Sequence, residues 1–349
     1  MGIETLMHIT RIRTCQPPCD SPKDWRTSLG QILVAIDTDV GLTGYGVGGG
    51  GLSAMHIVRT VLGDLLVGRK VEPIATRWQE MYDATLAFGR KGVAVMAISG
   101  VDLALWDLRA KAAGVSVAQL LGGPRHATLL TYATVWGDLS ATMVGTHSAF
   151  KLHLGKQEAG DVQPLVDVVR RARDRVGPGV TLMVDAWMKW DVPFTLRFAD
   201  AVVDLGLDWI EEPISPDDLA GYAELCMRSP IPIAGGEHEF TATAFQELID
   251  RRLHHVLQPD VCWVGGMTEL VKIYTAANQA GVRVCPHRGA EVWALPALAA
   301  LDSQPLAESG RPWLTWVGGQ PPICDGVIEV PSDVGFGATF STEVLAMLE

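Results

Sequence analysis

Short apolar runs alternate with amphipathic stretches through the second part of the chain, from residue 129 onward. This alternation predicts βα units, in which each apolar run is a buried parallel strand and each amphipathic stretch a covering helix. Seven or eight such units favour a (β/α) barrel. The alternative, a doubly wound open sheet, would require a glycine-rich phosphate turn after its first strand, and the sequence has none there. The apolar runs lie at 129–136, 149–154, 181–187, 209–213, 232–237, 255–261, 283–288 and 305–310.

The first part of the chain has a different pattern. Residues 5–48 alternate between apolar and polar positions, which predicts strands, with a hairpin turn at 39–44. Helical periodicity extends from about 52 to 122, and Gly114 is placed as a helix C-cap. The glycine-rich run at 46–51 lacks the Gly-Lys-Ser/Thr ending of a phosphate loop, so we interpret it as a flexible connector.

These patterns divide the chain into three segments. Residues 1–125 form an α+β domain, residues 126–310 the barrel, and residues 311–349 a tail that packs back onto the first domain. The polar segment 17–28 is too long to be a simple turn and is a candidate functional loop. The predicted fold class is therefore α/β, a modified TIM-like (β/α)7–8 barrel with an N-terminal α+β domain.

Composition narrows the class of protein. Hydrophobic residues make up 48% of the 349 residues and charged residues 19%, as in a well-buried globular protein. The net charge of −12 argues against a nucleic-acid partner, because no basic stretch is available to neutralise phosphates. The N-terminus has no apolar signal core, and no run reaches the length of a membrane span. We expect a cytoplasmic protein with no membrane partner. Because symmetric assemblies are the base expectation, we also expect a homo-oligomer.

Three of the apolar runs end in an acidic residue. Asp185, Glu211 and Glu237 follow one another at intervals of 26 residues, about the length of one strand, loop and helix. An acid at one strand end could be a helix cap or a solvated loop residue. Three in even register predict neighbouring carboxylates, and hard oxygen ligands of this kind suit Mg²⁺.

Other strand ends carry ionisable groups as well. Positions i and i+2 of a strand share a face, so Lys151 and His153 point into the same space. By the same rule Trp187 lies on the face of Asp185, whereas Glu212 and His238 should point away from the face of their acidic neighbours.

The last three barrel strands supply a possible general base. Asp260 ends one strand, His287 the next and Glu308 the last. A lone histidine is more often structural than catalytic, but here Asp260 could orient His287, as a general base requires.

The motifs now assembled resemble a known family. The chain is similar over nearly its whole length to the enolase superfamily, mandelate racemase subgroup, and most to its acid-sugar dehydratases of the L-rhamnonate dehydratase type. The residues that carry the resemblance are GVDLALWDLRAKAAGVSVAQLLGG (100–123), VDAWMKWDV (184–192), WIEEP (209–213), GGEHEF (235–240), QPDVCWVGGMTEL (258–270) and CPHRG (285–289).

The resemblance implies a role for each candidate residue. Asp185, Glu211 and Glu237 would be the Mg²⁺ ligands, and the Asp185-x-Trp187 sequence resembles the rhamnonate-type enzymes. The N-terminal domain would cap the barrel, and its loop at 17–28 would shape specificity. The remaining implied roles are a base in His287, held by Asp260, and substrate contacts by Glu308 and by Arg26 of the loop.

The chain departs from the subgroup at the second barrel strand. Racemases and several dehydratases of the subgroup carry Lys-x-Lys there, and this chain has Lys151-Leu-His153. We expect Lys151 and His153 chiefly to bind substrate oxygens, with Lys151 adding positive charge, while His287 acts as the single base.

The implied activity is a carbon–oxygen lyase reaction, a hydro-lyase acting on an L-rhamnonate-like aldonate. The enzyme would abstract the proton next to the carboxylate, form a metal-stabilised enediolate and eliminate the β-hydroxyl to give a 2-keto-3-deoxy acid. Two alternatives stay open: a racemase or epimerase using His153 and His287, and a catalytically silent sugar-acid-binding protein.

Overall fold

The computed structural model describes residues 7–18, 30–155, 160–311 and 314–349. Its first element is an antiparallel sheet of three strands, β1 (Ile9–Cys15), β2 (Ile32–Thr38) and β3 (Thr43–Gly48). The predicted hairpin is confirmed, since β2 and β3 pair in antiparallel register on either side of the turn at 39–42. Of the predicted loop 17–28, residues 19–28 lie outside the described residues.

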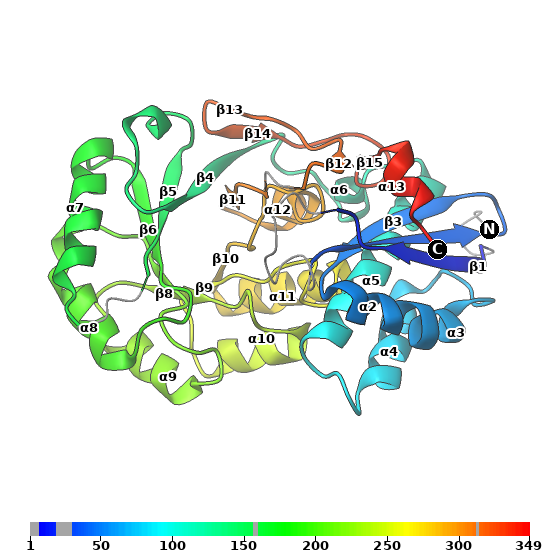
Figure 1. Ribbon diagram of the computed structural model, residues 1–349, viewed down its shortest axis with the longest axis horizontal. Helices are drawn as coiled ribbons and strands as arrows, with labels where there is room; N and C mark the ends of the chain where they lie inside the picture. The colour runs from blue at the N-terminus through cyan, green and yellow to red at the C-terminus, as the bar shows by residue number, and fades with distance from the viewer. Residues whose placement is uncertain (1–6, 19–29, 156–159, 312–313) are drawn as a thin grey trace.

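Helices follow the sheet and complete the N-terminal domain, shown in blue and cyan in Figure 1. The long α5 carries an apolar surface nearly all the way round, and most of its residues are buried. It ends as predicted at Gly114, whose φ of 69° suits a residue without a side chain. The helical segments are α2 (Gly51–Ile57), a π-helical turn (Val58–Leu62), α3 (Gly63–Leu66), α4 (Ile74–Thr85), α5 (Val93–Ala113) and α6 (Val117–Leu120).

The glycine-rich run packs against α5, and its interpretation as a flexible connector is wrong for β3. A Cβ atom on Gly46 would lie 2.2 Å from the backbone oxygen of Gly100, and one on Gly48 would lie 2.4 Å from that of Met96. The glycines therefore allow the strand to approach the helix backbone directly. Close packing between the sheet and α5 therefore explains why glycines occupy these positions.

In the part of the chain that the structure describes, the barrel contains eight parallel strands, one in each of the eight predicted apolar runs. Their order is β11-β4-β5-β6-β7-β8-β9-β10, with every neighbouring pair parallel. The barrel strands are β4 (Thr128–Trp136), β5 (Ala149–His153), β6 (Thr181–Asp185), β7 (Ile210–Glu211), β8 (Ile233–Gly235), β9 (Val256–Leu257), β10 (Arg283–Val284) and β11 (Leu306–Glu308).

None of the helices in the described ranges is long and apolar enough to cross a membrane.

Helices cover the outside of the barrel strands (Figure 1). Each presents an apolar face inward, as the amphipathic stretches of the sequence predict. They are α7 (Gln163–Val176), α8 (Val192–Ala201), α9 (Leu219–Arg228), α10 (Thr241–Asp250), α11 (Met267–Ala280) and α12 (Leu295–Leu301), with short 3₁₀ turns at Ala141–Met143 and Val203–Leu205.

The interior of the barrel is filled by one layer of side chains. Strand periodicity then places the residues two positions further along in the next layer, at the C-terminal ends of the strands. Met183 thus lies below Asp185, Trp209 below Glu211 and Cys285 below His287. The filling layer consists of Tyr132, Ala149, Met183, Trp209, Ala234, Val256 and Cys285.

The tail after residue 311 contacts both domains. Its strand β14 (Val327–Glu329) pairs antiparallel with β4 of the barrel, whereas α13 (Thr342–Ala346) lies beside the N-terminal sheet (Figure 1). The Thr14 N–H donates to the Glu349 carbonyl at 3.1 Å. Where the domain boundaries fall stays a prediction. The other tail strands are β12 (Val317–Gly318), β13 (Ile323–Cys324) and β15 (Thr339–Phe340).

The two domains meet along α5 and the start of α11. Buried Asp102 of α5 accepts hydrogen bonds from the Thr268 backbone N–H at 2.9 Å and from the Thr268 hydroxyl at 2.5 Å. A Cβ atom on Gly266 would lie 2.4 Å from the Asp102 carboxyl, so only glycine fits beside it. The Trp78 indole of α4 donates to the Gly265 carbonyl at 2.7 Å. These three hydrogen bonds fix the N-terminal domain on the barrel.

Asp102 makes the stability of this junction pH-dependent. Burial raises the pKa of its carboxyl from 3.8 to about 7 in the folded chain. Between those values the folded chain holds a proton that the unfolded chain has lost, so rising pH lowers the free energy of unfolding. We expect the Asp102→Asn variant to gain stability relative to the parent as pH rises from about 5 to 8 in urea titrations. Asparagine does not titrate, and its amide can accept from the Thr268 N–H and donate to the Thr268 hydroxyl oxygen. A stability difference that stays constant with pH would contradict this.

Candidate active site

One cavity of about 730 Å³ opens at the C-terminal ends of the barrel strands. Seven of the predicted site residues line it: Lys151, His153, Asp185, Trp187, Glu237, His287 and Glu308. The predicted residues Glu211 and Asp260 are 2% exposed and lie behind this wall, each in contact with one of its members. Arg26 lies outside the described residues. The barrel therefore gathers all the described candidates at one place.

The acids predicted to bind metal occupy adjacent strand ends. Asp185 and Glu211 are partners in the parallel register of β6 and β7, and Glu237 follows β8 by two residues. All three are at most 7% exposed. Burial and the Glu211 charge raise the pKa of Asp185 well above its ordinary value. Buried carboxylates that repel one another in this way call for a cation.

Lys151 supplies one such cation. Its Nζ lies 2.5 Å from Glu211 Oε1, 2.9 Å from Glu308 Oε1 and 3.7 Å from Asp185 Oδ2. Burial disfavours the ammonium, but Glu211 and Glu308 outweigh it and hold the pKa of Lys151 well above its ordinary value. Lys151 therefore stays charged at the centre of the acidic group.

His287 lines the same cavity as Lys151, from the end of β10. Its Nδ1 lies 3.0 Å from Asp260 Oδ2, and its Nε2 lies 2.9 Å from Glu237 Oε2. Burial acts to lower the pKa of His287, but the Glu237 charge and the Asp260 hydrogen bond raise it to about 10. Asp260 also contacts Arg288 at 3.2 Å, and the hydrogen bond from His287 holds the Asp260 pKa below its ordinary value despite burial. The expected pairing of Asp260 with His287 is present.

Glu308 connects the two sides of the cavity. Its carboxylate accepts from the Thr134 hydroxyl at 2.6 Å and from the Arg288 backbone N–H at 2.8 Å. Although burial opposes ionisation, Lys151 and His287 lower the pKa of Glu308 to about 2. Glu308 is therefore ionised, and its orientation is fixed by donors from the first and last parts of the barrel.

His153 has a different environment from Lys151. Its ring stacks on Trp136, with ring centroids 3.9 Å apart. Burial and the Lys151 charge lower the pKa of His153 to about 4, so it is neutral at pH 7. Trp136 itself is 65% exposed and lines the cavity, a placement that the sequence did not predict.

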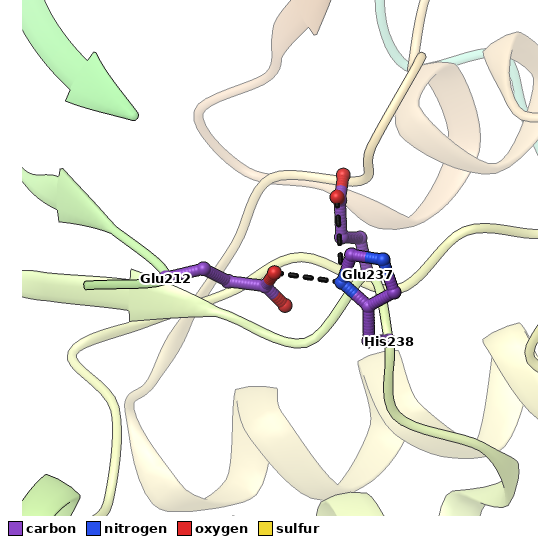
Figure 2. A group of neighbouring side chains, drawn as sticks. All are labelled: Glu212, Glu237 and His238. Carbon is purple, nitrogen blue, oxygen red and sulfur yellow. Dashed lines mark hydrogen bonds and ion pairs between the residues drawn. The ribbon is translucent and has the colours of Figure 1, made fainter. Parts of the chain in front are cut away.

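The expectation that Glu212 and His238 point away from the site is wrong. Glu212 has a φ of 37°, which breaks the strand alternation directly after Glu211. Its Oε2 lies 2.7 Å from His238 Nδ1, and the same nitrogen lies 3.4 Å from Glu237 Oε1 (Figure 2). Within the described ranges, these three residues are the group whose ligand atoms all lie within 4.8 Å of one another. The 26-residue spacing from Glu212 to His238 is the signal that could have indicated the pair.

Comparisons with known proteins match the whole architecture. Residues 11–122 match the model of the mandelate racemase / muconate lactonizing enzyme N-terminal domain, and residues 138–344 match the enolase C-terminal domain-like model. A putative L-rhamnonate dehydratase of Caldivirga maquilingensis is 37% identical over 284 residues, which are 80% of this chain and 71% of that protein.

Two solved structures illustrate the likeness in three dimensions. A rhamnonate dehydratase from Gibberella zeae complexed with Mg has a TM-score of 0.87 at 27% identity, covering 98% of this chain and 96% of that one. An L-talarate dehydratase from Polaromonas sp. JS666 complexed with Mg and L-glucarate has a TM-score of 0.86 at 30% identity, covering 98% of each chain. The chain therefore belongs to the mandelate racemase / muconate lactonizing enzyme family of the enolase superfamily.

Proposed function

We propose that this protein is a Mg²⁺-dependent hydro-lyase that dehydrates an acid sugar, an aldonate of the L-rhamnonate kind, to a 2-keto-3-deoxy acid. The observation that carries the proposal is that two units line one cavity. One is His287, paired with Asp260 at 3.0 Å, and the other is Lys151 with its three carboxylate partners. The 37% identical relative, named as a putative L-rhamnonate dehydratase, supports this substrate class.

The donor set fits magnesium. Asp185, Glu211 and Glu237 offer hard oxygen atoms from adjacent strand ends, the ligand type that Mg²⁺ prefers. In the ion pairs that the structure describes for the acids of the site, two partners carry a permanent positive charge, Lys151 and Arg288. Lys151 contacts Asp185 and Glu211 of the proposed metal ligands, whereas Arg288 contacts Asp260. The buried carboxylates therefore leave negative charge that a divalent cation would compensate. Mg²⁺ held by these acids would act as a Lewis acid toward the substrate carboxylate, making the proton on the neighbouring carbon more acidic.

His287 is the residue that moves protons in this proposal. The Glu237 charge keeps His287 protonated as long as that carboxylate faces the ring alone. With Glu237 committed to Mg²⁺, this charge would no longer hold the proton, and Nε2, the nitrogen that Asp260 leaves free, would take the proton from the carbon next to the carboxylate. The protonated imidazole then gives that proton to the departing β-hydroxyl, which leaves as water. The C–H and C–O bonds break, a C=C bond forms, and the resulting enol tautomerises to the 2-keto acid.

Lys151 and Glu308 prepare the substrate for this transfer. The Lys151 ammonium, charged and buried, would attract the substrate carboxylate and stabilise the negative charge that develops when the proton leaves. Glu308, held ionised beside it, would accept hydrogen bonds from the substrate. Both roles depend on preorganised charges at the cavity wall.

A second candidate function rests on His153. It lines the same cavity as His287 from a different strand and is neutral at pH 7, so a two-base racemase or epimerase is the alternative. A pKa of about 4 makes His153 a weak base, which favours dehydration with His287 alone. Incorporation of deuterium from D₂O into an acid sugar, with no loss of water, would identify the racemase.

The experiment that tests the proposal is a panel of aldonates and aldarates with Mg²⁺, assayed for 2-keto acid formation. We expect turnover of L-rhamnonate or a close stereoisomer, and loss of turnover with EDTA or in the Asp185→Asn variant. The matched control is Asp191→Asn, because Asp191 caps α8 at the end of the loop that follows Asp185, and asparagine caps a helix equally well. Binding of the acids without turnover of any would instead identify a silent binding protein.

A further inference from the structure

The site contains a second carboxylate–histidine pair that the proposed mechanism does not use. Asp260 Oδ2 lies 3.0 Å from the Nδ1 of His287, and Glu212 Oε2 lies 2.7 Å from the Nδ1 of His238. In each pair a carboxylate that is at most 2% exposed holds the Nδ1 side of the ring. A histidine held in this way presents its Nε2 in a fixed direction.

The two histidines lie on either side of one acid and share one aromatic neighbour. Glu237 Oε1 is 3.4 Å from His238 Nδ1, and Glu237 Oε2 is 2.9 Å from His287 Nε2. Each imidazole centroid is 5.9 Å from the centroid of the Trp263 ring. Figure 2 shows Glu212 and Glu237 converging on the same nitrogen of His238. His238 is thus as firmly oriented as the proposed base.

The backbone is strained where it delivers Glu212. A φ of 37° is uncommon for a residue with a side chain and costs on the order of 1 kcal/mol. Glu212 is 1% exposed, and its Oε1 has no hydrogen-bond partner. Among the described residues, the side-chain hydrogen bond found for this strained, buried acid is the one with His238, which indicates that the orientation of the ring matters.

The free side of the His238 ring belongs to the cavity. The side chain is 26% exposed and lines the cavity together with Lys151 and His287. The hydrogen bonds found for the ring in the described residues all involve Nδ1, which leaves Nε2 for a ligand. An imidazole nitrogen, whether it donates or accepts, and a sugar hydroxyl group are natural hydrogen-bond partners.

We propose that His238, oriented by Glu212, binds a hydroxyl group of the acid sugar beyond the reacting carbons and so contributes to substrate specificity. The inference rests on the proposed function for the class of ligand. It assigns to His238 a contact with substrate that is separate from proton transfer by His287 and from the acids Asp185 and Glu211.

The test compares His238→Asn with the parent protein. The asparagine amide keeps a donor near the position of Nδ1 for Glu212 and removes Nε2. With L-rhamnonate and its 4-deoxy and 5-deoxy analogues, we expect kcat/KM for L-rhamnonate to fall about 10-fold in the variant. For the one analogue that lacks the recognised hydroxyl, parent and variant should agree within about 2-fold. His56→Asn, an exposed histidine on α2, is the control and should change nothing.

Calorimetry separates this inference from the proposed function. If no acid sugar is turned over but His238→Asn binds L-rhamnonate about 10-fold more weakly than the parent, the inference stands and the dehydratase proposal fails. An equal loss for every analogue, unchanged binding, or no binding to the parent would overturn the inference. So would a loss of Mg²⁺ affinity in His238→Asn, because it would assign the ring to support of Glu237.

Discussion

Replacing His287 by asparagine is expected to lower kcat for dehydration by about 10³-fold or more, within the range that general acid–base residues contribute. In the proposed reaction the same Nε2 both removes the proton and delivers it to the leaving hydroxyl, so no step can proceed normally without it. Asparagine can still donate to Asp260 from near the position of Nδ1, which preserves the 3.0 Å contact that holds this part of the wall.

The measurement is steady-state kinetics with L-rhamnonate and Mg²⁺, together with calorimetric titration of Mg²⁺ into the variant. We expect the variant to bind Mg²⁺ at least as tightly as the parent does. In the parent, His287 Nε2 lies 2.9 Å from Glu237 Oε2 and competes with the metal for this oxygen, whereas the variant lacks that nitrogen. The control is His56→Asn, which changes an exposed histidine far along the chain from the barrel. A His287→Asn enzyme that keeps a tenth of the parent activity would exclude His287 as the base.

Replacing Lys151 by methionine is expected to lower the free energy of unfolding by about 3–5 kcal/mol in the absence of Mg²⁺, the usual cost of removing one partner from a buried charge network. The ammonium is 1% exposed and contacts Glu211, Glu308 and Asp185 at distances up to 3.7 Å. Methionine fills a similar volume, so the loss reports the uncompensated carboxylates rather than a cavity.

Magnesium separates this charge effect from a packing defect. A divalent cation among the same acids should restore part of the stability, so Mg²⁺ should stabilise Lys151→Met more than it stabilises the parent in urea titrations. Lys189→Met is the control, since Lys189 lines the cavity but is exposed and lies over the Trp187 ring at 4.9 Å. A loss below about 1 kcal/mol for Lys151→Met, typical of surface pairs, would contradict the central role of Lys151.

Residue periodicity made much of this site predictable. Four barrel strands carry one side chain in the filling layer and the next one, two residues later, in the cavity wall: Tyr132 and Thr134, Ala149 and Lys151, Met183 and Asp185, Cys285 and His287. Once Met183 and Trp209 are recognised as interior positions, Asp185 and Glu211 follow. The fold was predictable for the same reason, because eight apolar runs at regular spacing correspond to the eight barrel strands.

Features that depend on a departure from regular geometry were not predictable. Alternation fails at Glu212, where the left-handed φ turns the carboxylate toward His238. The glycines of β3 were interpreted as flexible because the sequence pattern does not show that the α5 backbone packs against them. The stacking of exposed Trp136 on His153 involves two strands whose pairing register the sequence alone does not fix.

The junction at Asp102 has a consequence for recombining these proteins. One could try to change the specificity of a two-domain enzyme by exchanging one whole domain between homologues. Here the carboxylate comes from the N-terminal half of the chain, and its two donors and the adjacent glycine come from residues 266–268 in the barrel. A chimaera that separates them would bury an acid without partners or place a side chain against it. Successful crossovers must carry α5 and the start of α11 together.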